Sequence, residues 1–182
     1  MTGEDRMSLL AMLEASREDL VRAVDGLGEE EALAKPPSGW SAVDCVEHLV
    51  LTERAIRERI RAQAALAAGV PEGFDSAKAE FLLKVVPARR GRAVAPPHLA
   101  PSGRFASLAD AAAAFQSERQ TTLDYIRDTP DDLHLCGTEH FVFKMLDGHQ
   151  WMVLLASHTT RHANQILELR DGSHQSPRNS TL

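Results

Sequence analysis

Hydrophobic residues recur at helical spacing over four long stretches of the chain, with charged residues between them and a glycine or proline soon after each. The four stretches are residues 7–24, 41–68, 107–129 and 149–170. A shorter pattern over residues 75–86 predicts one more helix, which Pro87 ends. The run HFVFKML could form a strand, but we expect no sheet because a lone strand has nothing to pair with.

The stretch 41–68 begins with clear local signals. Ser41 is a good N-cap, and Asp44 stands where a capping box prefers Glu or Gln. Trp40 is placed to act as a hydrophobic staple against Cys45. The second half of the stretch alternates arginines with glutamates, namely Glu53, Arg54, Arg57, Glu58, Arg59 and Arg61. We expect this half to be a solvated face with local ion pairs.

Residues 87–104 read PARRGRAVAPPHLAPSGR, rich in proline and arginine without a period, which favours an ordered crossover or lid. This segment joins the second and third long helices. We therefore predict an all-α four-helix bundle with a long Pro/Arg-rich crossover between helices 2 and 3. We expect one domain over residues 1–172 and a polar, disordered tail over 173–182.

Composition limits the location and the partners of the protein. A chain of 182 residues can build one domain with a real hydrophobic core. Polar residues interrupt every apolar run, and the N-terminus lacks the order of a signal peptide, so we expect a cytoplasmic protein without membrane contact. The net charge of -6 argues against nucleic acid as a partner. Cys45 and Cys136 lie far apart, and we expect both to be reduced thiols.

Two histidines lie four residues apart in the last long helix. At about 100° per residue, His158 and His162 fall on the same side as Trp151 and Ile166, in the stripe that should be buried. Buried histidines need a partner. The pair alone leaves two alternatives open, metal ligands or ordinary core or surface histidines. A zinc protease is disfavoured, because no glutamate follows His158 as in H-E-x-x-H.

His48 is the histidine best placed to join this pair. It lies seven residues after Ser41 in an apolar part of its helix. If the two helices run parallel, as alternating up-and-down order gives, His48 comes to the same depth as His158 and His162. Three imidazoles can hold a divalent ion with one position open. The ligand set does not identify the metal, although availability in cells favours zinc or iron.

The segments GWSAVDCVEHLVLTE and HQWMVLLASHTTRHANQI resemble the signature regions of the DinB-like superfamily of bacterial metal-binding four-helix bundles. The family pattern is a Trp-Ser helix start, a histidine seven residues after the serine, and a late H-x-x-R-H-x-x-Q-I helix. The resemblance implies that His48, His158 and His162 ligate zinc or nickel, and it implies a homodimer. Many members have a His-Pro pair where this chain has FVFKMLDG, so we assign no role to His140 or His149.

Four further residues could contact a substrate or the ligands. Arg161 and Gln165 lie on or beside the histidine face and could bind an anionic substrate or hydrogen-bond to the ligands. An ion pair with a neighbouring helix is the alternative for Arg161. Thr52 and Cys45 lie one turn either side of His48, where they could line a pocket or simply pack.

Three other polar residues near these positions are weaker candidates. Glu47 and Glu53 point away from His48 on a helical wheel, so neither is expected to act as a general base. His98 lies in the crossover and reaches the site only if the crossover folds over it.

Two functions remain open. In the first, the ion lowers the pKa of a bound thiol or water in a metal-dependent enzyme, a thiol S-transferase with a low-molecular-weight thiol as cosubstrate or a hydrolase with water. The DinB-like superfamily includes thiol transferases that use bacillithiol and a mycothiol-dependent maleylpyruvate isomerase. In the second, the ion stabilises a non-catalytic binding or stress-response module. The enzyme hypothesis implies a small-molecule substrate.

Overall fold

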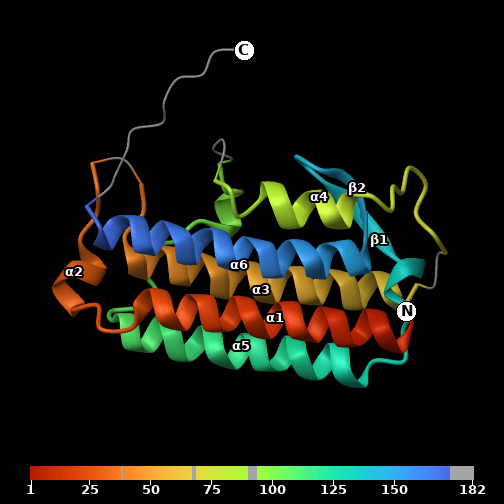
Figure 1. Cartoon of the computed structure of the whole chain (residues 1–182), viewed down its shortest axis with the longest axis horizontal. Helices are drawn as coiled ribbons and strands as arrows, with labels where there is room; N and C mark the ends of the chain where they lie inside the picture. Colours follow the sequence, from red (N-terminus) through yellow and green to blue (C-terminus); the bar gives the residue numbers. More distant parts are fainter. Residues whose placement is uncertain (38, 67–68, 90–93, 173–182) are drawn as a thin grey trace, which may run out of the picture.

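Four long helices form the body of the molecule (Figure 1). The computed structural model describes residues 1–37, 39–66, 69–89 and 94–172. The long helices are α1 (Gly3–Val24), α3 (Ala42–Ala64), α5 (Leu108–Asp128) and α6 (Gly148–Arg170). Helices α1 and α3 each pack against both α5 and α6, so the four close around one interior. The predicted four-helix bundle is confirmed.

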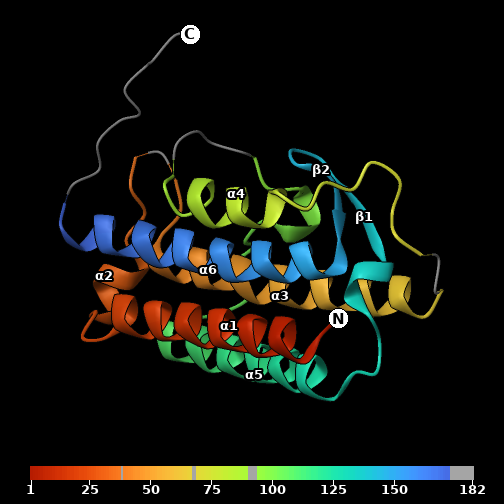
Figure 2. The same ribbon diagram turned by 45° about the vertical axis from the view of Figure 1, so that its right-hand side comes forward.

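The directions of the helices differ from the alternating order expected from the sequence. Helices α1 and α6 run one way, and α3 and α5 run the other way (Figure 1, Figure 2). The long connection after α3 causes this, because it returns the chain to the end of the bundle at which α3 began. The expectation that the helices carrying His48 and His158 are parallel is therefore wrong, since α3 and α6 are antiparallel.

Reciprocal capping fixes where three of the long helices begin. In each case the N-cap side chain accepts from the N–H of the third helical residue, whose side chain accepts from the cap's N–H. The pairs are Thr2 with Asp5, Ser41 with Asp44, and Asp147 with Gln150. Ser41 is thus the N-cap as predicted, and Asp44 completes the box. The first helix begins earlier than predicted, because Thr2 caps it at Gly3.

Short elements in the connections lie outside the bundle. They are α2 (Glu29–Leu33), α4 (Lys78–Val85), η1 (Pro97–Leu99) and η2 (Leu133–Leu135). The predicted short helix is α4, which packs against α6, and η1 packs against α3. The second long helix ends at Ala64, before its predicted end. The predicted tail 173–182 and residues 90–93 of the crossover lie outside the described residues.

A two-stranded antiparallel sheet precedes α6, which corrects the expectation that no strand would find a partner. Strand β1 (Gly137–His140) pairs with β2 (Lys144–Asp147), and Gly137 lies opposite Asp147. The apolar run HFVFKML is divided among the last residue of β1, the turn and β2, so its hydrophobicity did not mark a single strand. Each strand has only four residues, too few for an alternating pattern to be visible in the sequence.

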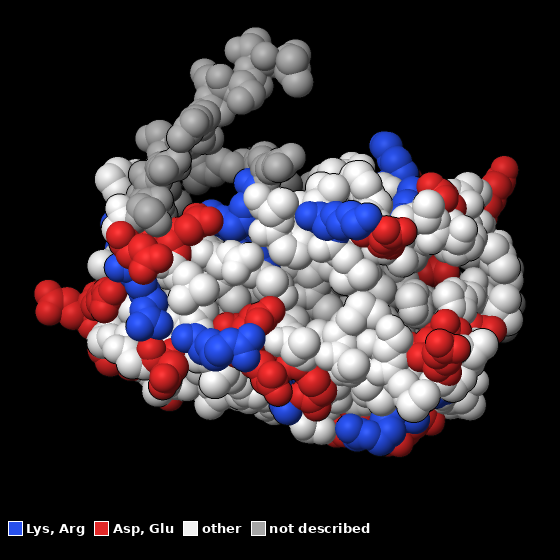
Figure 3. All heavy atoms as spheres, viewed as in Figure 1, with Lys and Arg blue, Asp and Glu red and all other residues white. Residues whose placement is uncertain are grey.

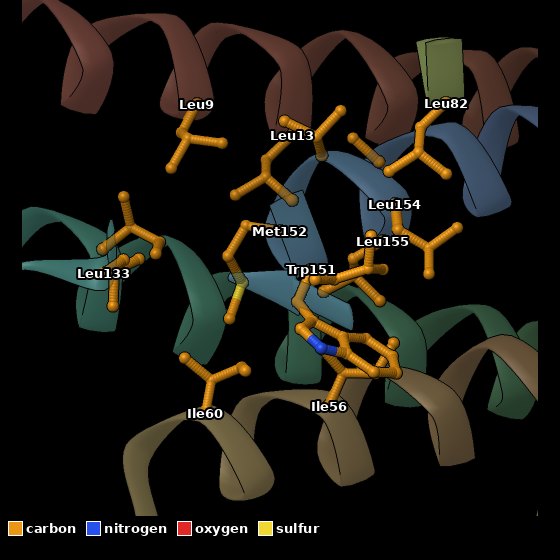
Figure 4. Packing of buried hydrophobic residues seen from close by; sticks show 14 of the residues in the cluster. Leu9, Leu13, Ile56, Ile60, Leu82, Leu133, Trp151, Met152, Leu154 and Leu155 are labelled. Carbon is orange, nitrogen blue, oxygen red and sulfur yellow. The ribbon is translucent and has the colours of Figure 1, made fainter. Parts of the chain in front are cut away.

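The main hydrophobic core lies between the four long helices and the outer helix α4 (Figure 4). Leucines of α1 and isoleucines of α3 face Met152 and Leu155 of α6. Leu82 extends this cluster outward and holds α4 against the bundle. Burial of each such side chain contributes about 1.5–3 kcal/mol, so packing positions the outer helix firmly.

The glutamate and arginine face of α3 is only partly solvated, which corrects the expectation for this half of the helix. Glu53 and Arg119 of α5 are both fully buried, with Nε and Oε1 2.8 Å apart. Arg57 is also buried and pairs with Glu118 at 2.7 Å. Helix α5 packs on this side of α3 and removes these charges from water. The remaining arginines of the face are exposed, as predicted.

Acidic and basic side chains are interspersed over the face of the molecule that Figure 3 shows, without a continuous basic patch. Among the described residues, no helix combines the length and the apolar character that a bilayer span requires.

Candidate metal centre

Three imidazole rings meet between α3 and α6. His158 and His162 lie one turn apart near the middle of α6, and His48 lies in the first half of α3. Because the two helices are antiparallel, these positions come to the same level of the bundle. The Nε2 atom of His158 lies 3.3 Å from Nε2 of His48 and 3.2 Å from Nε2 of His162. The structure thus brings together the three residues that the sequence predicts as ligands.

The tautomer of His48 is set by the crossover. Its Nδ1 donates to the backbone carbonyl of Leu99 at 2.7 Å, so the lone pair of the neutral ring is on Nε2, which faces the other two histidines. A hydrogen bond from the outer ring nitrogen to a carbonyl is the usual support of a metal-ligating histidine. The crossover therefore contributes directly to the site.

The other two histidines have polar atoms that the described protein leaves unsatisfied. Nδ1 of His158 and Nδ1 of His162 are buried and have no hydrogen-bond partner among the described residues. Buried polar atoms nearly always find a partner, so each exception needs a reason. Three Nε2 atoms this close also cannot satisfy one another, because a proton can bridge only one pair at a time. A cation bound by the three Nε2 atoms would resolve this conflict between them, although it would not contact either Nδ1.

The donor set fits a tetrahedral metal ion. Zinc–imidazole bonds are about 2.0–2.1 Å long, so two nitrogen ligands on a tetrahedral ion lie about 3.3 Å apart. The two Nε2 separations given above match this value. Three neutral imidazoles would leave one coordination position open, as in catalytic zinc sites.

Burial keeps the three rings neutral. It lowers the pKa of His48, and it lowers the pKa values of His158 and His162 well below the ordinary value. Repulsion between the three imidazoles and from Arg161 lowers the pKa values of the two α6 histidines further. Neutral rings with free lone pairs are the form that binds a metal.

Trp40 covers one side of the three histidines. Its ring centroid lies 4.7 Å from that of His48 and 5.8 Å from that of His162, on which it stacks. The role predicted for Trp40 from the sequence was only that of a hydrophobic staple at the start of α3. Its position just before the N-cap was a signal that its ring lies near the first turns, but nothing local indicated contact with α6.

Glu47 holds the crossover in the place that His48 requires. It is fully buried, and its carboxylate accepts from the backbone N–H groups of Ser102, Gly103 and Arg104 at 2.7–3.1 Å. The prediction that Glu47 points away from His48 agrees with this arrangement. Sequence reasoning missed its role, which is to position the segment that carries Leu99.

A cavity of about 900 Å³ lies beside the three histidines, between α3, α4, the crossover, the β1–β2 turn and α6. Most of its walls are apolar. The titratable residues among the described residues that line it are Arg59, Arg89, Arg161, His48, His98, His140, His158 and His162. No aspartate or glutamate is among them, although the chain has 26 acidic residues. The cavity is therefore suited to an anionic ligand with an apolar part.

The other predicted site residues fall into two groups. Thr52, Arg161 and Gln165 line this cavity together with the histidines. Arg161 donates to the carbonyl of Val86 at 3.0 Å, and Gln165 accepts from the Arg89 guanidinium at 2.8 Å. These contacts join α6 to the segment after α4.

Cys45 is placed differently, because it is fully buried in the hydrophobic core and is not among the residues that line the cavity. Burial raises the pKa of its thiol, which is unsuited to act as a nucleophile there. His98 lines the cavity, because the crossover folds over the site.

A second group of potential ligands, Asp5, His134 and His149, lies at the other end of α6. Two of its three residues already have protein partners. Asp5 caps α1, and Nδ1 of His134 lies 2.9 Å from the buried carboxylate of Asp147. No side-chain atom of the three residues is among the buried atoms that lack a partner in the described part of the chain, in contrast to Nδ1 of His158 and His162.

The fold and the site define a four-helix bundle with a buried three-histidine centre that opens on a cavity. A family model described as the DinB superfamily matches residues 12–166, and the chain belongs to this superfamily. The resemblance predicted from the two sequence segments is thus confirmed.

Among solved structures, the chain is similar to YfiT from Bacillus subtilis, described as a probable metal-dependent hydrolase with an unusual four-helix bundle topology. The TM-score is 0.63 at 16% sequence identity, over 97% of this chain and 91% of that one. At this identity the likeness shows the fold alone. No curated protein matches the chain by sequence.

Proposed function

We propose that the protein is a metal-dependent enzyme in which His48, His158 and His162 hold one divalent ion. The observation that carries the proposal is the convergence of three Nε2 atoms beside a cavity whose described lining residues include no carboxylate. Zinc or nickel is the expected ion, and iron suits the same donors. Such an ion lowers the pKa of a bound water or thiol and so supplies a nucleophile near neutral pH.

The protein's own residues would select and orient the substrate. Arg161 and Gln165, on α6 with His158 and His162, are proposed to contact the reacting part of a small molecule beside the ion. Thr52 of α3 also lines the cavity. The apolar walls exclude water, which strengthens each of these electrostatic contacts.

We favour hydrolysis over thiol transfer as the reaction. The description of YfiT as a probable metal-dependent hydrolase supports this choice, because its chain has the same fold. A low-molecular-weight thiol as cosubstrate is the alternative, and it would make the protein an S-transferase. A module that uses the ion only for stability is a third reading, which the size of the cavity disfavours. We further propose a cytoplasmic homodimer, which sedimentation can test.

The test compares tag-free protein loaded with zinc or nickel, with and without a chelator, on a panel of small carboxylate-bearing esters, amides and thiol-reactive electrophiles. Turnover that the chelator abolishes and the metal restores is expected, together with loss of turnover in His158→Ala. His149→Ala, which changes a histidine of the same helix outside the centre, is the matched control and should retain activity. Turnover unaffected by the chelator would contradict the proposal. A large loss of thermal stability on chelation, without turnover on any member of the panel, would favour the stabilising role.

A further inference from the structure

The end of β1 and the β1–β2 turn form the end of the cavity near the start of α6, and β1 ends on a histidine, His140, to which sequence analysis assigns no role. The ring of His140 stacks on those of Phe141 and Phe143, with centroids 4.5 and 5.0 Å away, and lies 5.2 Å from that of Trp151. All four residues line the cavity. The imidazole is thus held in an aromatic wall and has little freedom to turn.

The proton on this ring has a defined position. Nδ1 of His140 accepts from the backbone N–H groups of Val142 and Phe143, at 3.0 and 3.1 Å. In the neutral ring the hydrogen is therefore on Nε2, which has no acceptor among the described residues. Burial, together with the nearby Arg59, lowers the pKa of His140 to about 4, so the ring is neutral at physiological pH. His140 consequently offers one oriented N–H donor.

Arg59 of α3 is the second polar group at this end of the cavity. Its guanidinium lies over the Trp151 ring, 5.5 Å from the centroid. Within the described part of the chain, no carboxylate lies within ion-pair distance of it, whereas Arg54 and Arg57 on the preceding turn both bind Glu118. At the other end of the cavity, Arg161 and Arg89 already bind protein oxygens. Of the three arginines that line the cavity in the described part of the chain, Arg59 is therefore the one whose donors are available.

We propose that Arg59 and His140 form an anion subsite that binds the carboxylate of an amphiphilic small molecule. A guanidinium fork binds a planar carboxylate through two parallel hydrogen bonds, and a neutral N–H donor adds one more without a further charge. One cation and one neutral donor match a monoanion better than a phosphate dianion. The aromatic residues around the pair provide the apolar surface that such a molecule would bury.

The position of the subsite defines the length of the ligand. Trp151 and His158 are two turns apart on α6, about 10 Å along the helix axis. Leu154 lines the cavity between them. A molecule with its carboxylate at Arg59 would therefore need an apolar body of about 10 Å to present a reacting group to the three histidines. This role at the metal centre rests on the proposed function, but binding of the carboxylate does not.

The experiment measures binding to metal-free protein, so that it is independent of the proposed reaction. The probes are 6-phenylhexanoate and its neutral amide, titrated by calorimetry and by tryptophan fluorescence. The wild type is expected to bind the carboxylate in preference to the amide. Arg59→Gln should weaken binding of the carboxylate by about tenfold or more and leave binding of the amide unchanged.

Matched variants separate the subsite from general charge effects. Arg61→Gln removes an exposed arginine that also lies over an aromatic ring, Tyr125 at 5.8 Å, but outside the cavity, and should leave binding unchanged. His140→Asn keeps an acceptor for the turn and removes the Nε2 donor, so it should weaken carboxylate binding.

Three results would overturn the subsite. They are equal binding of carboxylate and amide, no binding of either by the wild type at millimolar concentration, or binding unchanged in Arg59→Gln. None of these bears on metal content, so failure of the subsite is distinguishable from failure of the metal centre.

Discussion

Helices α3 and α6 share two buried polar clusters that differ in how completely their hydrogen bonds are made. In the first, Glu53 accepts from Arg119, which also donates to Thr159 of α6 at 2.9 Å and to Ser16 of α1 at 2.7 Å. In the second, His158, the neighbour of Thr159, meets His48 and His162 beside the cavity. The guanidinium and carboxylate of the first cluster have protein partners, whereas the three Nε2 atoms of the second meet with only one proton able to bridge one pair at a time.

The difference separates a structural cluster from a site. A buried ion pair with all its hydrogen bonds made can hold four helices together and needs nothing from outside. A buried group of neutral lone pairs is complete only with a cation, and its place beside a cavity gives that cation access to a substrate. Whether a buried polar cluster in a bundle is structural or functional is therefore decided by whether its polar atoms are all paired. Burial alone does not distinguish the two kinds of cluster.

The largest effect on stability is expected from breaking the structural cluster. Glu53→Gln leaves Arg119 as a buried charge without its carboxylate and should lower the free energy of unfolding by about 3–5 kcal/mol. Arg54→Gln, which breaks only an exposed contact to Glu118, should cost less than about 1 kcal/mol. Urea unfolding of the three proteins measures both. Equal effects of the two changes would show that the buried pair does not have the structural role assigned to it.

A pH-dependent loss of stability is expected in the metal-free protein. The pKa values of His48, His158 and His162 are lowered by burial, so the unfolded chain takes up protons first as pH falls below the ordinary value of 6.5. Stability should therefore be fully present above about pH 6.5 and be lost below it, by about 1.4 kcal/mol per pH unit for each histidine.

Urea unfolding in the presence of a chelator, between about pH 7.5 and 5.5, measures this slope. His158→Leu removes one of the three groups and should make the slope shallower. The same slope in the variant and the wild type would mean that the three histidines are not buried in their neutral form.

The four helices and the positions of the three histidines along them were predictable because they depend on local signals. Helical spacing placed His158 and His162 on one face, and Ser41 fixed the start of the helix that carries His48. The relative direction of α3 and α6 was not predictable in this way, because it depends on where the long connection returns the chain. The three histidines meet in spite of the wrong predicted direction because His158 lies near the middle of α6.

The other features that the sequence did not reveal depend on contacts between distant segments. Glu53 is buried only because α5 brings Arg119 to it, and Glu47 acts on residues more than fifty positions away. His140 lines the cavity because its short strand pairs with β2. Strands of four residues are too short for this pairing to be predicted from the sequence. These residues have no periodic pattern of their own.

The most direct test of the metal centre is the metal content of tag-free protein, measured by mass spectrometry for the wild type, His162→Ala and the matched control His149→Ala. We expect about one zinc or nickel ion per chain in the wild type and the control. His162→Ala should bind the ion more than about 100-fold less tightly, because it loses a ligand rather than a supporting partner. Equal metal content in all three proteins would contradict the assignment of His48, His158 and His162 as the metal centre.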